Sequence, residues 1–212
     1  MTPEELVESA CPIIGAIGAG YMFDPKTGEA GAKIGMPNMF VFYFGGRGGV
    51  LGDVDADVVT SANGFFAPDL VRTMWDQALE VAPANDCAVA YGEACASFGR
   101  EKLADVEGLA EFCELAQKVV DAADISGYAM FAGWKNAPRA DDAPAKAYQL
   151  VNLLREYRGS AHICATMAHG VTAAEAVAVN GGPDRLKMFG WDPELKPDED
   201  TVEALAAAER AT

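Results

Sequence analysis

Runs of β-branched residues are few in this sequence of 212 residues, and their scarcity argues against a β-sheet. Alanine is abundant instead, which favours helix. Half of the residues are apolar, so the chain can bury a real core and does not resemble a disordered protein. We therefore predict an all-α fold, a multi-helix bundle of about eight to ten helices.

Cysteine pairs are also missing. The chain has five cysteines, an odd number, and no two of them form a Cys-x-x-Cys pair. The patterns of zinc ribbons, c-type haem proteins and thioredoxins are therefore absent. Free and mostly buried thiols are typical of a reducing compartment, so we predict a cytoplasmic protein. A catalytic cysteine is the weaker alternative, with Cys164 best placed for it.

Positive charge is scarce as well. The chain has 16 lysines and arginines against 32 aspartates and glutamates, a formal net charge of −16 at pH 7. Such a field repels nucleic acid and anionic membrane surfaces. The start of the chain is acidic at Glu4 and Glu5, unlike a secretory signal, and the apolar stretch 11–23 is too short to span a bilayer. We expect neither a nucleic acid nor a membrane as partner.

The common nucleotide-binding motifs are not present. Gly15, Gly18 and Gly20 form G-x-x-G-x-G rather than the dinucleotide pattern G-x-G-x-x-G, and no strand pattern precedes them. The glycine-rich segment 45–52 lacks the lysine and hydroxyl residues of a P-loop. No motif identifies a cofactor, and no set of metal ligands is predicted.

Several local signals predict where helices begin and end. Thr2 before Pro3 begins one helix, Asp142 before Pro144 begins a second, and Thr172 with Glu175 forms a capping box at the start of a third. Asp105 is expected to cap a helix in the middle of the chain. The apolar run before residue 45 is expected to end in a glycine-rich turn at 45–52.

The most polar interior segment, residues 135–142, suggests a division of the chain. We predict a helical N-terminal part over 1–135, a helical C-terminal part over 142–192, and an acidic tail over 193–212. The two parts are expected to share one compact domain. A faint likeness between the segments around Arg47 and Arg158 is compatible with two similar halves, and chance explains it equally well. The tail is either a docking helix or a loose end.

What the sequence does contain is a concentration of bases on one predicted helix. His162 and His169 are the only histidines, and their spacing of seven residues stacks them on one helical face, with Arg155 and Arg158 near the same face. Histidine titrates near neutral pH, and arginine offers a fork for carboxylate or phosphate. We predict a catalytic role for His162 and ligand contacts for Arg155, Arg158 and His169.

Two other interpretations of these bases stay open at this point. Ordinary helix histidines with polar partners would have the same pattern. A metal or haem site is weaker, because seven residues of helix separate the two imidazoles by about 10 Å, too far for one shared ion on a straight helix.

A second candidate is the glycine-rich segment around Arg47. Four glycines flank this arginine and would let the backbone approach a ligand closely, and Tyr43 lies one helical turn before it. Aromatic residues such as Tyr43 line many apolar ligand pockets. We predict that Tyr43 and Arg47 contact the ligand. The alternative is a tight turn between helices with Arg47 paired to an acidic neighbour.

Both segments resemble conserved blocks of the SalK-like actinobacterial family. The first block corresponds to residues 42–52, 57–59 and 65–68, and the second to 154–162 with Gly170, Glu175, Gly190 and Trp191, so that the likeness extends over residues 5–192. The resemblance implies a helical fold with a helix-turn-helix-like element. Members are largely uncharacterised, and some are encoded among genes of specialised metabolism.

The resemblance also separates the candidate residues. Arg158 and His162 match the family pattern, whereas His169 does not clearly match it. Longer members continue past the position of Trp191 into a winged-helix-like region that is missing or much shortened here. Together with the negative charge, this departure argues against DNA binding.

We therefore predict a small-molecule-binding protein, or an enzyme of specialised metabolism, with an Arg/His pocket for an anionic or carbonyl-bearing ligand. The pocket would combine Arg47 and Arg158 with His162 as proton donor or acceptor. The alternative is a regulatory or interaction protein derived from a helix-turn-helix ancestor without strong DNA binding. A haem or metal protein is a third, weaker alternative. A homo-oligomer is compatible with the sequence.

Overall fold

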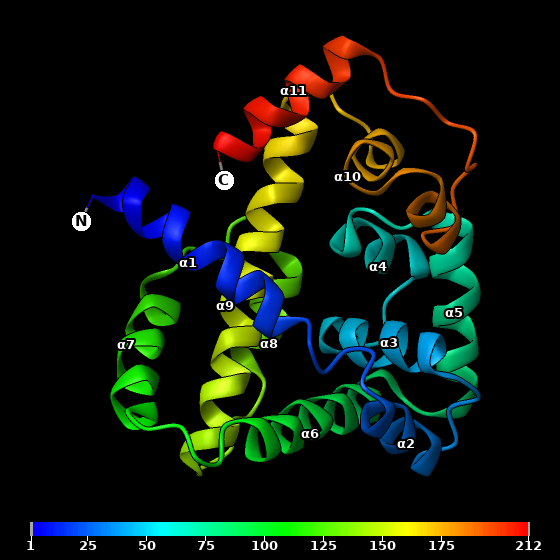
Figure 1. Cartoon of the computed structure of the whole chain (residues 1–212). Coiled ribbons are helices and arrows are strands. Elements are labelled where there is room, and N and C mark those ends of the chain that lie inside the picture. The colour runs from blue at the N-terminus through cyan, green and yellow to red at the C-terminus, as the bar shows by residue number, and fades with distance from the viewer. Residues whose placement is uncertain (1, 212) are drawn as a thin grey trace.

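A computed structural model describes residues 2–211, and within that range every regular element is helical (Figure 1). The prediction of an all-α, multi-helix fold is confirmed, with eleven α-helices and one short 3-10 helix in the described residues. The helices are α1 (Pro3–Gly18), α2 (Pro25–Lys33), α3 (Met39–Gly48), η1 (Gly49–Leu51), α4 (Ala56–Asn63), α5 (Pro68–Val81), α6 (Ala84–Lys102), α7 (Leu109–Ala122), α8 (Ala129–Asn136), α9 (Ala143–Ala168), α10 (Ala173–Met188) and α11 (Glu199–Arg210).

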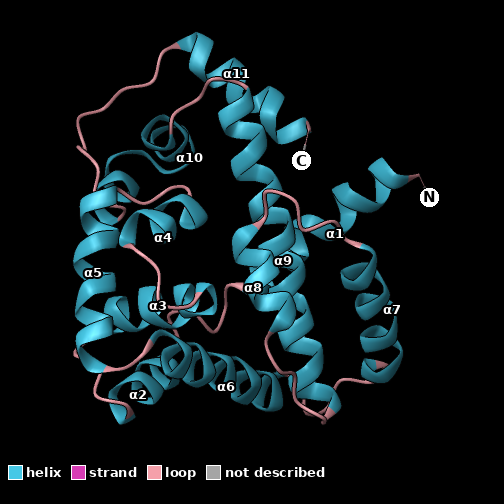
Figure 2. Ribbon diagram, turned by 180° about the vertical axis from the view of Figure 1, so that it is seen from behind, coloured by secondary structure: helices cyan, strands magenta, loops and turns pink. Residues whose placement is uncertain are grey.

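The long helix α9 organises the fold. It packs against α1, α6, α7, α8, α10 and α11. In Figures 1 and 2, α9 and α5 stand as two columns, α3 and α6 run between them at one end, and α10 lies between them at the other.

The predicted helix starts are confirmed where the capping signal is local. Thr2 and Thr172 each form a capping box, accepting from the backbone N–H three residues later while Glu5 or Glu175 accepts from the cap residue. Asp142 caps α9 by accepting from the backbone N–H of Ala145. These caps satisfy N–H groups that have no partner within the helix.

The expected glycine-rich turn at 45–52 is wrong, because α3 continues as a helix to Gly48 and a 3-10 helix follows. The glycines serve helix packing instead. A Cβ on Gly46 would lie 2.5 Å from Cβ of Tyr91, and one on Gly49 would lie 2.2 Å from the carbonyl oxygen of Ala84. Only glycine lets α3 and η1 approach α6 this closely, which outweighs its low helix propensity.

The expected cap at Asp105 is also wrong. Helix α7 begins at Leu109, directly after Gly108, whose φ of 77° only glycine adopts readily. Asp105 lies in the loop before it. A different conformation with positive φ, at Gly182 (φ 61°, ψ −160°), interrupts α10, although the chain resumes helical geometry afterwards.

The main hydrophobic core contains residues from both sides of the segment 135–142, including Trp75 and Tyr91 on one side and Tyr148 and Leu150 on the other. The C-terminal segment is a docked helix rather than a loose end, since α11 packs on α9 and buries Leu205. Among the described residues, no helix is both long enough and apolar enough to cross a bilayer.

Candidate functional site

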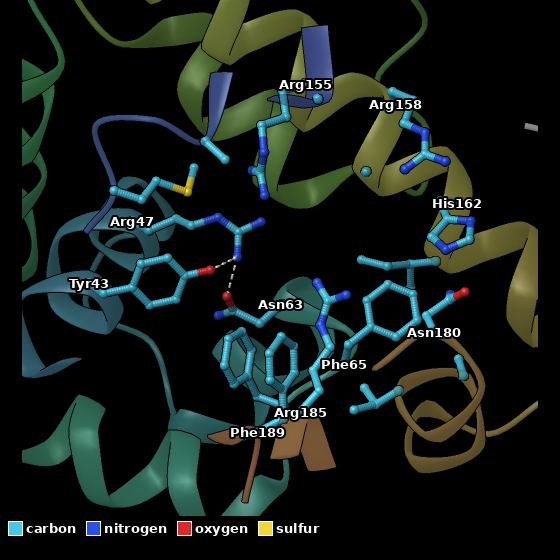
Figure 3. Close-up of a pocket in the computed structure, with 18 of the residues that line it drawn as sticks. Tyr43, Arg47, Asn63, Phe65, Arg155, Arg158, His162, Asn180, Arg185 and Phe189 are labelled. Carbon is cyan, nitrogen blue, oxygen red and sulfur yellow. Dashed lines mark hydrogen bonds between the residues drawn. The ribbon is translucent and has the colours of Figure 1, made fainter. Parts of the chain in front are cut away.

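A cavity of about 590 Å³ lies beside α9 and is bounded by α1, α3, α4, α10 and α11 (Figure 3). This volume is in the range of small-molecule sites. Its polar lining comes from five helices: Tyr43, Arg47, Asn63, Arg155, Arg158, His162, Asn180, Arg185 and Glu209. Its apolar lining is mainly aromatic and aliphatic, including Ile14, Phe23, Phe40, Phe65, Phe66, Ile163, Met188 and Phe189.

Arginine is concentrated around this cavity. The chain has eight arginines, and four of them line it, whereas no lysine does. Glu209 is the one carboxylate among the described residues of the lining. In a chain with a net charge of −16, this is a local reversal of sign. Such a reversal attracts anions even when the average field repels them.

The inner end of the cavity, formed by Tyr43, Arg47, Asn63 and Glu156, is held by a buried ion pair. Nε of Arg47 donates to Oε1 of Glu156 at 2.9 Å, and its Nη2 donates to Oε2 at 2.7 Å. Nη1 donates to the hydroxyl of Tyr43 at 3.2 Å and to the side-chain carbonyl of Asn63. The guanidinium is therefore bound on all of its nitrogen atoms, through two parallel bonds that fix its plane.

Burial and pairing act in opposite directions on this ion pair. Burial by itself lowers the pKa of Arg47 and raises the pKa of Glu156, because it disfavours either charge. The attraction and hydrogen bonds between the two groups are stronger. The pKa of Arg47 therefore lies well above its ordinary value, the pKa of Glu156 lies below its ordinary value, and both stay charged.

Arg155 connects the inner end to the rest of the cavity. Its Nη1 donates to Oε1 of Glu156 at 3.1 Å, so two guanidinium groups share one carboxylate. Its side chain is 27% exposed, against 8% for Arg47. Figure 3 shows Arg155 pointing from α9 toward Arg47. One positive charge at this end is therefore not neutralised by Glu156.

The outer end, formed by Arg158, His162, Asn180, Arg185 and Glu209, is open to solvent and less tightly bonded. The guanidinium groups of Arg158 and Arg185 make no ion pair or hydrogen bond with any residue in the described range. Arg185 lies over the ring of Phe189, with its central carbon 5.4 Å from the ring centroid. Figure 3 shows Arg185 reaching into the cavity from the side opposite Arg155.

His162 lies at this outer end but is itself buried, with 8% of its surface exposed. Its ring packs against Phe65, with centroids 5.4 Å apart, and its Nδ1 has no hydrogen-bond partner in residues 2–211. Burial and the nearby charge of Arg158 lower the pKa of His162, and Glu209 partly opposes them. The imidazole is therefore neutral at pH 7, and one of its buried polar atoms is left unsatisfied.

The structure does not bring His169 to the cavity. This residue caps the end of α9, is exposed, and its Nδ1 lies 2.8 Å from the carbonyl oxygen of Ala165. Its spacing from His162 does keep both on one side of the helix, but seven residues correspond to a rise of about 10 Å. The cavity ends before that point. The other predicted residues, Tyr43, Arg47, Arg155, Arg158 and His162, all line it.

Four residues of the site had no signal that singled them out in the sequence: Asn63, Asn180, Arg185 and Glu209. Each lies on a helix other than α3 and α9, where both sequence candidates were found. Glu156 lies between Arg155 and Arg158 of the first candidate, but its pairing with Arg47 spans 109 residues of sequence. A metal centre has no counterpart here, since no group of three histidine, cysteine, aspartate or glutamate side chains in the described part of the chain is placed to hold an ion.

Comparison with known proteins gives one informative result. No curated protein and no solved structure matches the chain. The profile of a helix-turn-helix family, however, matches residues 8–209. This match covers nearly all of the described fold, from α1 to α11, and both ends of the cavity. The chain therefore belongs to this helix-turn-helix family.

Proposed function

We propose that this protein binds a small organic anion in the arginine-rich cavity, as a binding protein or an enzyme of specialised metabolism. One observation carries the proposal: Arg158 and Arg185 face a cavity of about 590 Å³ without an anionic partner in the described residues. An arginine that lines a cavity with its donors unused is suited to carboxylate or phosphate.

The remaining residues have complementary roles in this proposal. Phe65 and Phe189 offer an apolar wall for the body of the ligand. His162 lines the cavity and hydrogen-bonds a polar group of the ligand, and with a carbonyl-bearing ligand its imidazole would donate or accept the proton. Arg47 is fully occupied by Tyr43, Asn63 and Glu156, so it shapes the inner end and contributes charge rather than new hydrogen bonds.

The test is isothermal titration calorimetry at low salt with benzoate, phenylacetate and terephthalate. We expect at least one of them to bind the natural protein, and Arg158→Gln to weaken that binding about tenfold or more, since a hydrogen bond to a charged group contributes about 1.5–3 kcal/mol. Arg72→Gln is the matched control, because Arg72 is an exposed arginine that is paired with Asp57 and does not line the cavity. Failure of every anion to bind contradicts the proposal.

A regulatory or interaction protein is the second candidate, and the family match favours it. Helices α4 and α5 pack together and are joined by residues 64–67 alone, a connection of helix-turn-helix length. Phe65 and Phe66 in this connection line the cavity. A ligand in the cavity would therefore contact the connection between these two helices, as expected of a metabolite-responsive regulator.

The surface of α5 supports a protein partner over DNA for this second candidate. Its exposed face bears Asp69, Asp76 and Glu80, and its one arginine, Arg72, is already paired with Asp57. DNA binding by such a helix would bring carboxylates toward phosphates. A mobility-shift assay at 50 mM salt, with and without terephthalate, tests this: a shifted DNA probe that is released at higher salt would favour a DNA-binding regulator.

A further inference from the structure

The charges around the cavity do not cancel, and the excess of positive charge indicates the charge of the ligand. Four guanidinium groups face the cavity or its inner wall, and two carboxylates, Glu156 and Glu209, face them. His162 is neutral at pH 7, because burial and Arg158 lower its pKa. Two positive charges therefore remain within a space the size of one small molecule.

These two charges lie at different places. At the inner end, Arg47 and Arg155 share the single carboxylate of Glu156, which leaves one positive charge on the side of Arg155. At the outer end, Arg158 and Arg185 are opposed by Glu209 alone. Glu209 forms no ion pair with either arginine, and its Oε1 instead accepts from Nδ2 of Asn180 at 3.4 Å. Each end of the cavity is thus short of one negative charge.

The wall between the two ends is apolar and aromatic. The rings of Phe66 and Phe189 stack with centroids 4.1 Å apart and an angle of 2° between their planes, and Phe65 packs against His162. These rings are packed against one another, and together they give the cavity an apolar wall that favours an apolar ligand body. Arg185 extends along this wall over the ring of Phe189 (Figure 3).

We infer that the ligand is an organic dianion with two separate carboxylates, one at each end of an apolar body. The inner carboxylate is bound by Arg155, and the outer one by Arg158 and Arg185, beside His162. This inference rests on the proposed function and narrows it to a chemical class. It also explains why four of the eight arginines in this acidic chain line one cavity.

Three probes with one benzene ring separate the possibilities in calorimetric titrations at pH 7.5. Terephthalate has carboxylates at opposite ends of the ring, 4-methylbenzoate replaces one of them with a methyl group of similar size, and phenyl phosphate has both charges on one group. We expect terephthalate to bind the natural protein at least about tenfold more tightly than 4-methylbenzoate, as for one added charge-assisted contact.

The variant Arg185→Gln tests the assignment of the outer end. Arg185 is exposed, so its replacement leaves the core intact. We expect the preference for terephthalate over 4-methylbenzoate to fall below about threefold in Arg185→Gln and to persist in Arg72→Gln, since a lost charge contact removes most of a tenfold preference. Circular dichroism of both variants checks that they remain folded.

Each other outcome has a definite meaning. Equal binding of terephthalate and 4-methylbenzoate would overturn the dianion while leaving the proposed function intact. Tighter binding of phenyl phosphate than of terephthalate would overturn the two separate carboxylates in favour of one doubly charged group. If none of the three probes binds while another anion does, the two-ended dianion is wrong, and if no anion binds at all, the proposed function is wrong with it.

Discussion

The inner and outer ends of the cavity contain the same side chain in opposite circumstances. Arg47 is buried and bonded on every nitrogen, with Glu156 as its counter-charge. Arg158 and Arg185 line the same cavity, and their guanidinium groups have no anionic partner in the described residues. An arginine is structural where the fold supplies its carboxylate and is available to a ligand where the fold does not.

This difference has an energetic origin. A buried charge without a partner costs several kcal/mol, so the inner end had to be completed by the protein itself. A half-exposed guanidinium keeps much of its hydration and tolerates an empty partner position. The outer end can therefore lack a bound anion without destabilising the fold.

The largest expected effect breaks the inner end. Glu156→Gln removes the carboxylate shared by Arg47 and Arg155 and leaves a buried positive charge uncompensated. We expect the free energy of unfolding to fall by about 3–5 kcal/mol, measured by urea denaturation. The exposed pair offers the control, since Arg72→Gln should change stability by about 0.5 kcal/mol or less. A loss as small as that of the control would show that the inner pair is not structural.

The second prediction breaks the outer end alone. Arg158→Gln should weaken binding of a carboxylate ligand by about ten- to a hundredfold, the range for a hydrogen bond to a charged group, while stability changes by only about 0.5 kcal/mol. Calorimetry and urea denaturation measure the two quantities on the same variant. If stability falls as far as in Glu156→Gln, the two ends do not differ as described.

The third prediction sharpens the outer end. Glu209 is exposed on α11 and is the one carboxylate of the described lining, so it repels an incoming anion. Replacement by Gln keeps its size and its contact to Asn180 but removes the charge. We expect Glu209→Gln to bind carboxylates about two- to fivefold more tightly, consistent with a screened surface charge. Unchanged or weaker affinity would mean that Glu209 does not oppose the ligand.

The smallest expected effect concerns pH. The pKa of His162 is lowered from its ordinary value of 6.5, first by burial and then by Arg158. A bound anion stabilises the imidazolium and raises this pKa, so binding takes up protons between the two pKa values. Affinity should therefore rise about two- to threefold as pH falls below 6.5, as for a partly buried charge pair.

Proton uptake is measured directly by titrating in buffers of different ionisation enthalpy. His162→Gln should abolish both the uptake and the pH dependence of affinity. The same lowered pKa means that the unfolded chain binds a proton first, so His162 should cost the free protein stability as pH falls below 6.5. Affinity that falls over this range, rather than rising, would place the imidazole away from the anion.

Features that depend on nearby residues could be predicted from the sequence. The caps at Thr2, Asp142 and Thr172 involve contacts three residues apart, and the structure contains them. Arg158 and His162 are four residues apart on α9, so helical geometry alone places them on the same face. The role of the glycines after Tyr43 could not be predicted in this way. They allow close packing against α6, and the local sequence does not show that contact.

The amino-acid sequence by itself determined that this protein is helical, acidic and built with clear local caps, because propensity, charge and capping act over a few residues. Only the tertiary structure decided which bases share a cavity and which of them already have a partner. Arg47 meets Glu156 across 109 residues, and Arg185 and Glu209 reach the cavity from α10 and α11. Such contacts are set by the packing of whole helices around α9, so the difference between a structural and an available arginine is visible only in the folded chain.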